Sequence, residues 1–331
     1  MALRAMGPSL SRLREREIMT AYILRRLLAT VPVMAVVAVF VFFLLRIAPG
    51  DPAAIIAGED ATAEAINAVR AKLGLDRPVL EQFALWLWRL AQGDLGDSIF
   101  SNLPVTRLIA QRLEPTVALT LSTLFVAVAL AIPVGVIAAW QVRKLADRLV
   151  MIFAVLGFAV PGFLAAYVLI YIFAVQLQWL PVQGYRPIAE GLWPFIEGLI
   201  LPSIALGVTY MALIARITRA SMLEVLSQDY IRTANSKGLA TRRVLLLHAL
   251  KNAAVPIVTV IGIGIALLIS GVVITETVFN IPGLGRLTVD AVLKRDYPIV
   301  QGLILVFAAA KVLVNLVIDI SYAFLDPRIR Y

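Results

Sequence analysis

Long apolar runs separated by short, basic stretches dominate the hydrophobic pattern of this chain. A helix needs about 20 consecutive, predominantly apolar residues to cross the hydrocarbon core of a bilayer. Six runs reach or approach that length: 27–45, 117–140, 149–177, 198–215, 253–275 and 298–325. The first five carry no charged residue, and the sixth is interrupted only by Lys311 and Asp319. The pattern predicts an all-α polytopic membrane protein with six transmembrane helices.

The segment between the first two runs is too polar to cross a bilayer and long enough to form a small water-facing domain. Within it, the stretch LDRPVLEQFALWLWRLAQGDLG is amphipathic, with Phe83, Leu87 and Leu90 near helical spacing. The predicted organisation is a first transmembrane helix over 19–46, this domain over 47–116, and a transmembrane core over 117–325.

Composition supports lipid as the solvent, because 61% of the 331 residues are hydrophobic and 15% are charged. A net charge of +9 is also typical of nucleic-acid binding, but the cations lie in short loops between apolar runs. Membrane topology explains them better, and no nucleic-acid partner is expected. The chain has no cysteine, which excludes disulfides and thiolate sites.

The distribution of lysine and arginine predicts the orientation. With a cytoplasmic N-terminus, the cytoplasmic segments hold 18 cations against six anions, and the opposite side holds 11 against 14. Cytoplasmic loops are enriched in cations, so both termini and the loop 216–252 are predicted to be cytoplasmic. The domain over 47–116 is then extracytoplasmic, and the residues 326–331 form a cytoplasmic tail.

The N-terminus resembles a signal peptide in placing basic residues before an apolar run, but it lacks a clear small-residue cleavage site. We interpret the run as a retained anchor. Arg25 and Arg26 are a weak twin-arginine match, and flanking cations of a first span explain them better. The residues 1–18 are expected to be a dispensable cytoplasmic extension or the product of an upstream start.

The chain lacks the sequence motifs that it would need to hydrolyse ATP or to act as a membrane protease on its own. It contains no P-loop sequence for ATP, and it has neither an H-E-x-x-H motif nor a pair of intramembrane carboxylates. Its one histidine, His248, has no second ligand near it in sequence, which favours a packing role over metal binding. Prolines interrupt several runs, either shaping a cavity or simply reflecting ordinary membrane-helix composition. The sequence indicates a passageway whose energy comes from elsewhere.

The stretch DYIRTANSKGLATRRVLLLHALKNAAVPIV, residues 229–258, predicts two short cytoplasmic helices with Gly238 as a C-cap or bend between them. In the second helix, an apolar face of Val244, Leu246, Leu247 and Leu250 is expected to oppose Arg242, Arg243 and Lys251. Such a segment serves either as a docking surface for another protein or as an interfacial helix on anionic lipid.

These patterns come with a family resemblance that runs from Met19 to Tyr331. It rests on five ordered pieces: LLRIAPGDPA, DYIRTANSKG followed by HALKNAAVPIVT, ETVFNIPGLGRLTVDAV, RDYPIVQ and DPRIRY. The chain resembles the membrane subunits of ATP-binding-cassette importers, especially the peptide/nickel permease subfamily. The resemblance implies the type I importer permease fold and a place in a bacterial inner membrane.

The family's cytoplasmic EAA motif, which fits a cleft of the ATPase subunit, maps onto the stretch that follows Ile231. Ala234 matches its second alanine and Gly238 its glycine, while Thr233 and Arg232 replace its first alanine and its glutamate. The implied coupling residues are Arg232, Thr233, Ala234, Gly238 and Leu239. The two replacements put in doubt detailed contacts borrowed from importers that keep the glutamate.

The resemblance implies three kinds of protein partner besides membrane lipid: a second related permease, two ATPase subunits and an extracytoplasmic solute-binding protein. No cofactor is expected in this chain, and ATP and Mg²⁺ would bind the partner ATPases. Members of the subfamily move dipeptides, oligopeptides, glutathione or nickel. Peptide is the predicted substrate, with nickel and glutathione as alternatives.

Lys311, Asn315 and Asp319 recur every four residues of the sixth run and therefore form one stripe on a helix. Ionisable groups in lipid are costly and usually face a cavity or another helix. The stripe either lines a pathway or holds helices or subunits together. Two other functions stay open, a secondary transporter, although no internal repeat is evident, and a membrane scaffold without transport.

Overall fold

The computed structural model describes residues 25–43, 51–58, 61–72 and 74–325. The predictions for the segments 1–18 and 326–331 lie outside these residues. All regular elements in the described ranges are helices, apart from an isolated bridge between Asp97 and Pro104. The all-α prediction is confirmed.

The chain divides into two compact units. One unit contains the residues up to 111 together with 288–312, and the other contains 112–287 and 313–330. Three helices, α5, α13 and α14, contribute residues to both units.

The helices that begin in the first unit include an apolar first helix, the short helices of the segment that follows it, and the beginnings of α5 and α14. Their bounds are Arg25–Phe43, α2 Pro52–Ala57, α3 Ala63–Lys72, α4 Val79–Ala91, α5 Val105–Trp140 and α14 Tyr297–Leu325.

The second unit holds the remaining helices and the beginning of α13, including the stretch singled out at residues 229–258. The bounds are α6 Leu145–Ala159, α7 Gly162–Leu169, η2 Ile170–Gln176, η3 Ile188–Glu190, α8 Leu192–Leu226, α9 Asp229–Ser236, α10 Thr241–Arg243, η4 Val244–Ala249, α11 Leu250–Asn252, α12 Ala254–Val278 and α13 Leu284–Lys294.

Four described helices are long and apolar enough to cross a membrane, and two bent helix pairs raise the number of spans to as many as six. The four helices are Arg25–Phe43, Val105–Trp140, Leu192–Leu226 and Tyr297–Ile320. Together with the bent pairs they cover all six apolar runs, in agreement with the predicted six-span architecture.

The third run is not one straight helix. Its two parts, Leu145–Ala159 and Gly162–Gln176, meet at a bend of 108°. Proline disfavours a helical conformation of the preceding residue and has no N–H for the helix ladder. Val160 is accordingly extended, with φ −89° and ψ 121°, and α7 begins directly after Pro161.

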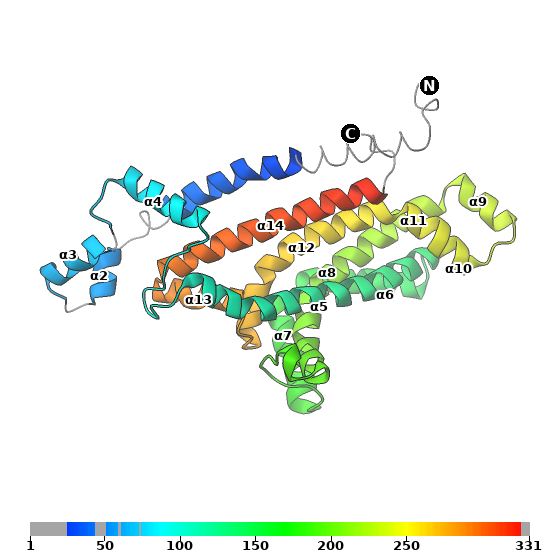
Figure 1. The fold of residues 1–331 in the computed structure, drawn as a ribbon. Helices are drawn as coiled ribbons and strands as arrows, with labels where there is room; N and C mark the ends of the chain where they lie inside the picture. The colour runs from blue at the N-terminus through cyan, green and yellow to red at the C-terminus, as the bar shows by residue number, and fades with distance from the viewer. Residues whose placement is uncertain (1–24, 44–50, 59–60, 73, 326–331) are drawn as a thin grey trace, which may run out of the picture. The chain divides into compact units, whose positions relative to one another are not determined.

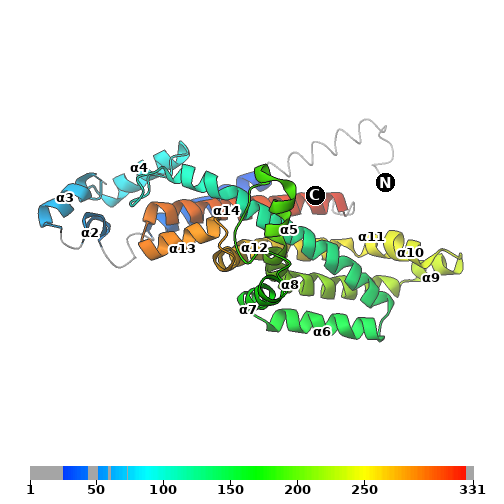
Figure 2. The same cartoon turned by 90° about the horizontal axis from the view of Figure 1, so that it is seen from below.

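Helix α8 is the central helix of the second unit, where it packs against both α6 and α12 (Figures 1 and 2). Of its most apolar 18-residue window, 61% is buried, against 11% for α14. Gly157 of α6 faces Ala212, and a Cβ there would come within 2.8 Å of the alanine Cβ. Small residues at such crossings let helix backbones approach closely in membranes.

The first unit has its own apolar cluster, in which the first helix packs with α4 and α14. Ala38, Val41 and Leu305 are its buried members. The Gln301 side chain donates a hydrogen bond of 3.0 Å to the carbonyl of Val41. This contact satisfies a polar group inside an otherwise apolar interface.

Candidate functional site

The stretch at residues 229–258 forms short helices at one end of the long helices α5, α8 and α12 (Figure 1). Gly238 follows α9 with φ +72°. The N–H of Gly238 bonds to the Asn235 carbonyl, and the N–H of Leu239 bonds to the Ala234 carbonyl. This pair of bonds is the Schellman motif, so the predicted C-cap role of Gly238 is confirmed.

The five predicted coupling residues are divided between two surfaces. Ala234 is buried in the chain's own apolar cluster, and Leu239 packs against that cluster. Arg232, Thr233 and Gly238 are exposed. Only these three, with neighbouring side chains such as Tyr230, are available to a docking protein without rearrangement of the segment.

The apolar cluster under α9 connects this helix to three long helices. Ile231 and Ala234 of α9 pack with Met222 at the end of α8. The same cluster contains Val136 and Ala139 of α5 and Ile257 of α12. The cluster therefore places α9 in one packed core with all three long helices.

The second short helix differs from its predicted face. Val244 is buried and Leu250 half-buried as expected, but Leu246 and Leu247 are exposed beside Arg242 and Arg243. The residues Val244–Ala249 form a π-helical turn, which carries one extra residue and rotates the side chains that follow. The predicted apolar face therefore has a part that is buried within the chain and a part that is exposed.

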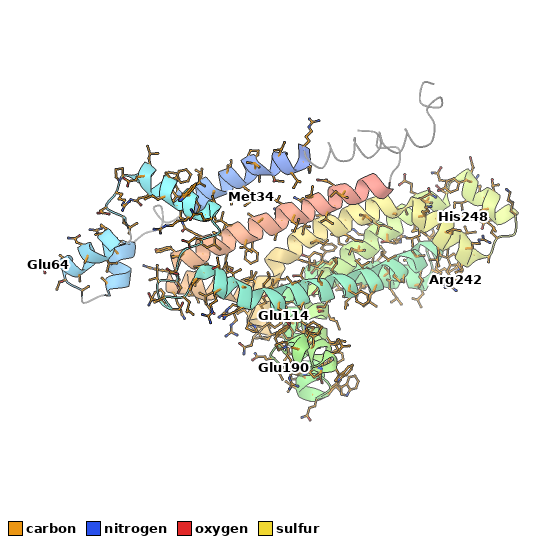
Figure 3. All side chains as sticks on the ribbon, in the orientation of Figure 1. Met34, Glu64, Glu114, Glu190, Arg242 and His248 are labelled. Atoms are coloured by element: carbon orange, nitrogen blue, oxygen red, sulfur yellow. The ribbon has the colours of Figure 1, made fainter. Side chains whose placement is uncertain are left out.

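His248 is half-buried in this π turn, and its backbone carbonyl accepts a hydrogen bond of 2.6 Å from the Asn252 side chain. Figure 3 labels Arg242 and His248 on this segment. No group of three or more histidine, cysteine or acidic side chains in the described residues is arranged to hold a metal ion.

A buried ion pair near the same ends of the long helices was not predicted. Asp147, in the first turn of α6, accepts two hydrogen bonds from the guanidinium of Arg219 on α8. It also accepts a bond of 2.8 Å from the backbone N–H of Arg143. Bidentate arginine–carboxylate pairs are among the strongest and most directional polar contacts in proteins. The pair therefore fixes α6 against α8.

A second polar cluster joins α5, α12 and α13. The carboxylate of Glu276 is fully buried and accepts hydrogen bonds from the Thr116 hydroxyl, at 2.6 Å, and from the Arg286 N–H, at 3.0 Å. The Thr116 oxygen in turn accepts a bond of 2.7 Å from the N–H of Leu284. Glu276 and Thr116 thus supply acceptors to the first N–H groups of α13, which lack helical partners.

Two glycines make room for this cluster, which explains part of the sequence piece ETVFNIPGLGRLTVDAV. A Cβ at Gly283 would overlap the Glu276 carboxylate, and one at Gly285 would lie 2.6 Å from the Val273 Cα. The signal available in the sequence was an acidic residue, Glu276, six positions before a Pro-Gly-x-Gly turn that begins at Pro282.

A third contact holds the segment between η2 and α8. The Tyr185 hydroxyl donates to Glu114 of α5 at 3.0 Å, and the N–H of Ile188 approaches the same oxygen at 3.4 Å. Glu114 and Glu190 are labelled in Figure 3. Burial, followed by the neighbouring Glu114 carboxylate, raises the pKa of Tyr185, so this hydroxyl stays a donor at physiological pH.

The piece RDYPIVQ has a corresponding role in the first unit. Asp296 is buried and accepts hydrogen bonds from the Ser98 hydroxyl, at 2.6 Å, and from the Ile99 N–H, at 3.3 Å. Gln301 binds the first helix, as described above. The piece therefore ties the segment before α5 and the first span to the beginning of α14.

The predicted polar stripe lies on α14, with Lys311 and Asn315 exposed and Asp319 half-buried. Lys311 lies 14 residues from either end of α14, which is about 21 Å along the axis. Among the described residues no acidic side chain forms an ion pair with Lys311.

Comparison with known families covers most of the chain. Residues 131–331 match the family described as binding-protein-dependent transport system inner membrane component. Residues 19–120 match the N-terminal family of such membrane components.

Relatives of known name align over 313 residues. A probable peptide ABC transporter permease protein of Sinorhizobium fredii is 52% identical, over 95% of this chain and 100% of the relative. A putative peptide transport system permease protein of Brucella abortus and the glutathione transport system permease protein of Escherichia coli K12 are each 44% identical, with the same coverage.

Among solved structures, the inward-facing MetNI methionine ABC transporter matches with a TM-score of 0.54 and 16% sequence identity. The match covers 66% of this chain and 96% of that chain. At this identity, the similarity concerns the fold.

Proposed function

The chain belongs to the family of inner-membrane components of binding-protein-dependent transport systems, and from this premise we propose that it forms half of the pathway of an ATP-driven peptide importer. The names of relatives that align along their whole length support the peptide substrate. The sequence has no P-loop, so the energy must come from separate ATPase subunits that bind ATP and Mg²⁺.

The observation that carries the coupling role is the apolar cluster under α9. Its exposed side, with Arg232, Thr233 and Gly238, offers a surface to an ATPase, and its buried side connects to α5, α8 and α12. Closure of two ATPases around ATP would move α9, and the cluster would carry this motion into the spans. The complete importer would add a second permease and a solute-binding protein.

The experiment is uptake by the purified complex in proteoliposomes, with loaded binding protein outside and ATP inside. We expect labelled dipeptides or oligopeptides to accumulate in an ATP-dependent manner, and glutathione and Ni²⁺ to accumulate less. Uptake of glutathione alone would support the second candidate, which the Escherichia coli relative favours. Uptake of Ni²⁺ alone would contradict both.

The role of Lys311 belongs to the same proposal. An exposed ammonium at the middle of a membrane helix is costly in lipid, and its side chain is too short to reach either interface. It must therefore face a water-filled pathway or a carboxylate of the second permease. Replacement of Lys311 by Met separates the two, because only an intersubunit contact predicts that the permeases no longer co-purify.

If Lys311→Met complexes assemble, the pathway role predicts a selective effect on substrates. Uptake of peptides with a free C-terminal carboxylate should fall, whereas uptake of the same peptides with an amidated C-terminus should not. Equal uptake of both peptides by an intact variant complex would contradict both roles.

A further inference from the structure

Helix α4 has an apolar surface that the rest of the chain leaves uncovered. On one side, Phe83 and Trp86 pack on Phe42 of the first helix, with ring centroids 4.9 and 5.7 Å apart. On another side, Leu80 is 81% exposed and Trp88 is 65% exposed. Side chains of this size are rarely left in water as a continuous strip.

The sequence of α4 places these side chains on a separate strip. At 3.6 residues per turn, Leu80, Ala84, Leu87 and Trp88 fall within an arc of roughly 100°. The arc lies between the packed strip and a strip that carries Glu81 and Arg89, with Leu85, 40% exposed, between them. The helix therefore has a protein-facing side, an uncovered apolar side and a side that carries its charges.

The first helix fixes the level at which α4 lies relative to the membrane. The apolar run 27–45 has 19 residues, and as a helix at 1.5 Å per residue it would be about 28 Å long, close to the roughly 30 Å of the hydrocarbon core. Arg25 and Arg26 mark one boundary, so Phe42 and Phe43 mark the other. Because α4 packs on Phe42, it lies at this second boundary.

We propose that α4 lies in the membrane–water interface, with Leu80, Leu87 and Trp88 in contact with phospholipid and with Glu81 and Arg89 in water. Tryptophan is enriched at this depth, and helices with such separated faces bind in the interface plane. The exposed apolar surface of the first helix continues to the same level through Phe40 and Phe43, at 59% and 39% exposure.

The contact anchors the segment between the first helix and α5 to the bilayer surface. It requires only that the first helix spans the membrane and is independent of the transported substrate. A failure of peptide uptake would leave it intact.

The absence of cysteine in the chain makes a direct test available. Single cysteines replace Leu80, Trp88, Glu81 or Arg89, all exposed residues, and each receives a nitroxide label in the complete complex in liposomes. Power-saturation spectra then measure collisions of each label with O₂, which is concentrated in lipid, and with a water-soluble nickel chelate.

We expect O₂ to dominate at positions 80 and 88 and the nickel chelate to dominate at positions 81 and 89. When amphipol replaces lipid in detergent-free buffer, the difference in collision rates between positions 80 and 88 and positions 81 and 89 should become smaller. Strong nickel collisions at all four positions would place α4 in water and overturn the proposal. Labels at 80 and 88 that neither reagent reaches would show that another protein covers the strip, which would also overturn it.

Discussion

Gly238 has a positive φ and open space around it, since no heavy atom lies within 4 Å of an added Cβ. The glycine is therefore needed inside this chain for its backbone conformation. A left-handed conformation costs an ordinary residue roughly 1–2 kcal/mol, and asparagine tolerates it better than other side chains.

A pair of substitutions follows from this conformation. Gly238→Val should reduce the ATPase stimulation by loaded binding protein and reduce uptake, whereas Gly238→Asn should retain most of both. Both activities are measured on purified complexes with normal subunit content. If asparagine is as harmful as valine, close approach of an ATPase rather than φ requires the glycine. Wild-type activity of the valine variant would contradict the coupling role of the segment.

The position of Ala234 in the EAA motif suggested contact with an ATPase, but Ala234 packs inside this chain. Its side chain is 8% exposed and packs in the chain's own cluster. A charge at this position is expected to disturb α9 itself, and so a loss of transport in Ala234→Asp would not report on ATPase contact. The exposed neighbour Thr233 is the better probe of docking.

Glu276 gives a prediction about stability. Replacement by alanine leaves the Arg286 N–H without its buried acceptor, at a cost of about 1–3 kcal/mol, and leaves the Thr116 hydroxyl only its 3.4 Å hydrogen bond to the Arg112 carbonyl. We expect Glu276→Ala to lower the thermal unfolding midpoint of the solubilised chain. Glu224→Ala, at an exposed position, is the matched control and should leave the midpoint unchanged. Equal midpoints for the two variants would show that the cluster does not stabilise the fold.

At the scale of elements, the contact between α6 and α8 depends on the Asp147–Arg219 pair. The carboxylate side chain is 6% exposed and the guanidinium 21%. Removal of one partner from a buried pair costs about 3–5 kcal/mol, and the partial exposure of Arg219 lowers this figure. We expect Asp147→Ala and Arg219→Ala each to destabilise the chain, and the double variant to lose less than the sum of both.

This coupling is measured from thermal unfolding of the four proteins of a double-mutant cycle. Losses that add fully would show that the two side chains act independently. Arg148→Ala, which removes a neighbouring cation without an ion-pair partner among the described residues, serves as the control.

Most elements could be predicted from hydrophobic pattern, because a span must be long and apolar to satisfy the bilayer. Pro161 signals an interruption of the third run, but the 108° angle of the bend depends on packing, and the π turn at Val244–Ala249 has no signal in the local sequence. Phe83 and Leu87 share helical spacing on an amphipathic stretch, but only packing decides which of them is covered: Leu87 is 43% exposed, while Phe83 and Trp86 contact Phe42.

The polar contacts were the least predictable part of the site. Asp147 and Arg219 are 72 residues apart in the sequence, and Thr116 and Glu276 are 160 apart. Pairs of this kind arise from the packing of complete helices, and local pattern contains no signal for them. The C-cap role of Gly238 could be predicted because a helix C-cap is determined by adjacent residues.

For the whole molecule, membership of this transport family explains the six-span pattern. It takes the place of the two other functions considered from the sequence, a secondary transporter and a membrane scaffold. The family and the fold match also confirm the resemblance drawn from the five sequence pieces. The orientation of the chain rests on the distribution of cations, which the fold by itself does not determine.

A thiol-labelling experiment tests that orientation in a chain that has no cysteine of its own. Glu64 on α3 and Gln228 before α9 are both exposed, so a cysteine at either position should be reactive wherever the reagent can reach it. If the cationic loops are cytoplasmic, a membrane-impermeant maleimide added to intact spheroplasts should modify Glu64→Cys and spare Gln228→Cys. Permeabilised cells provide the control, because both variants should then react fully. Modification of Gln228→Cys alone in intact spheroplasts would reverse the orientation and place the segment around α9 beyond the reach of a cytoplasmic ATPase.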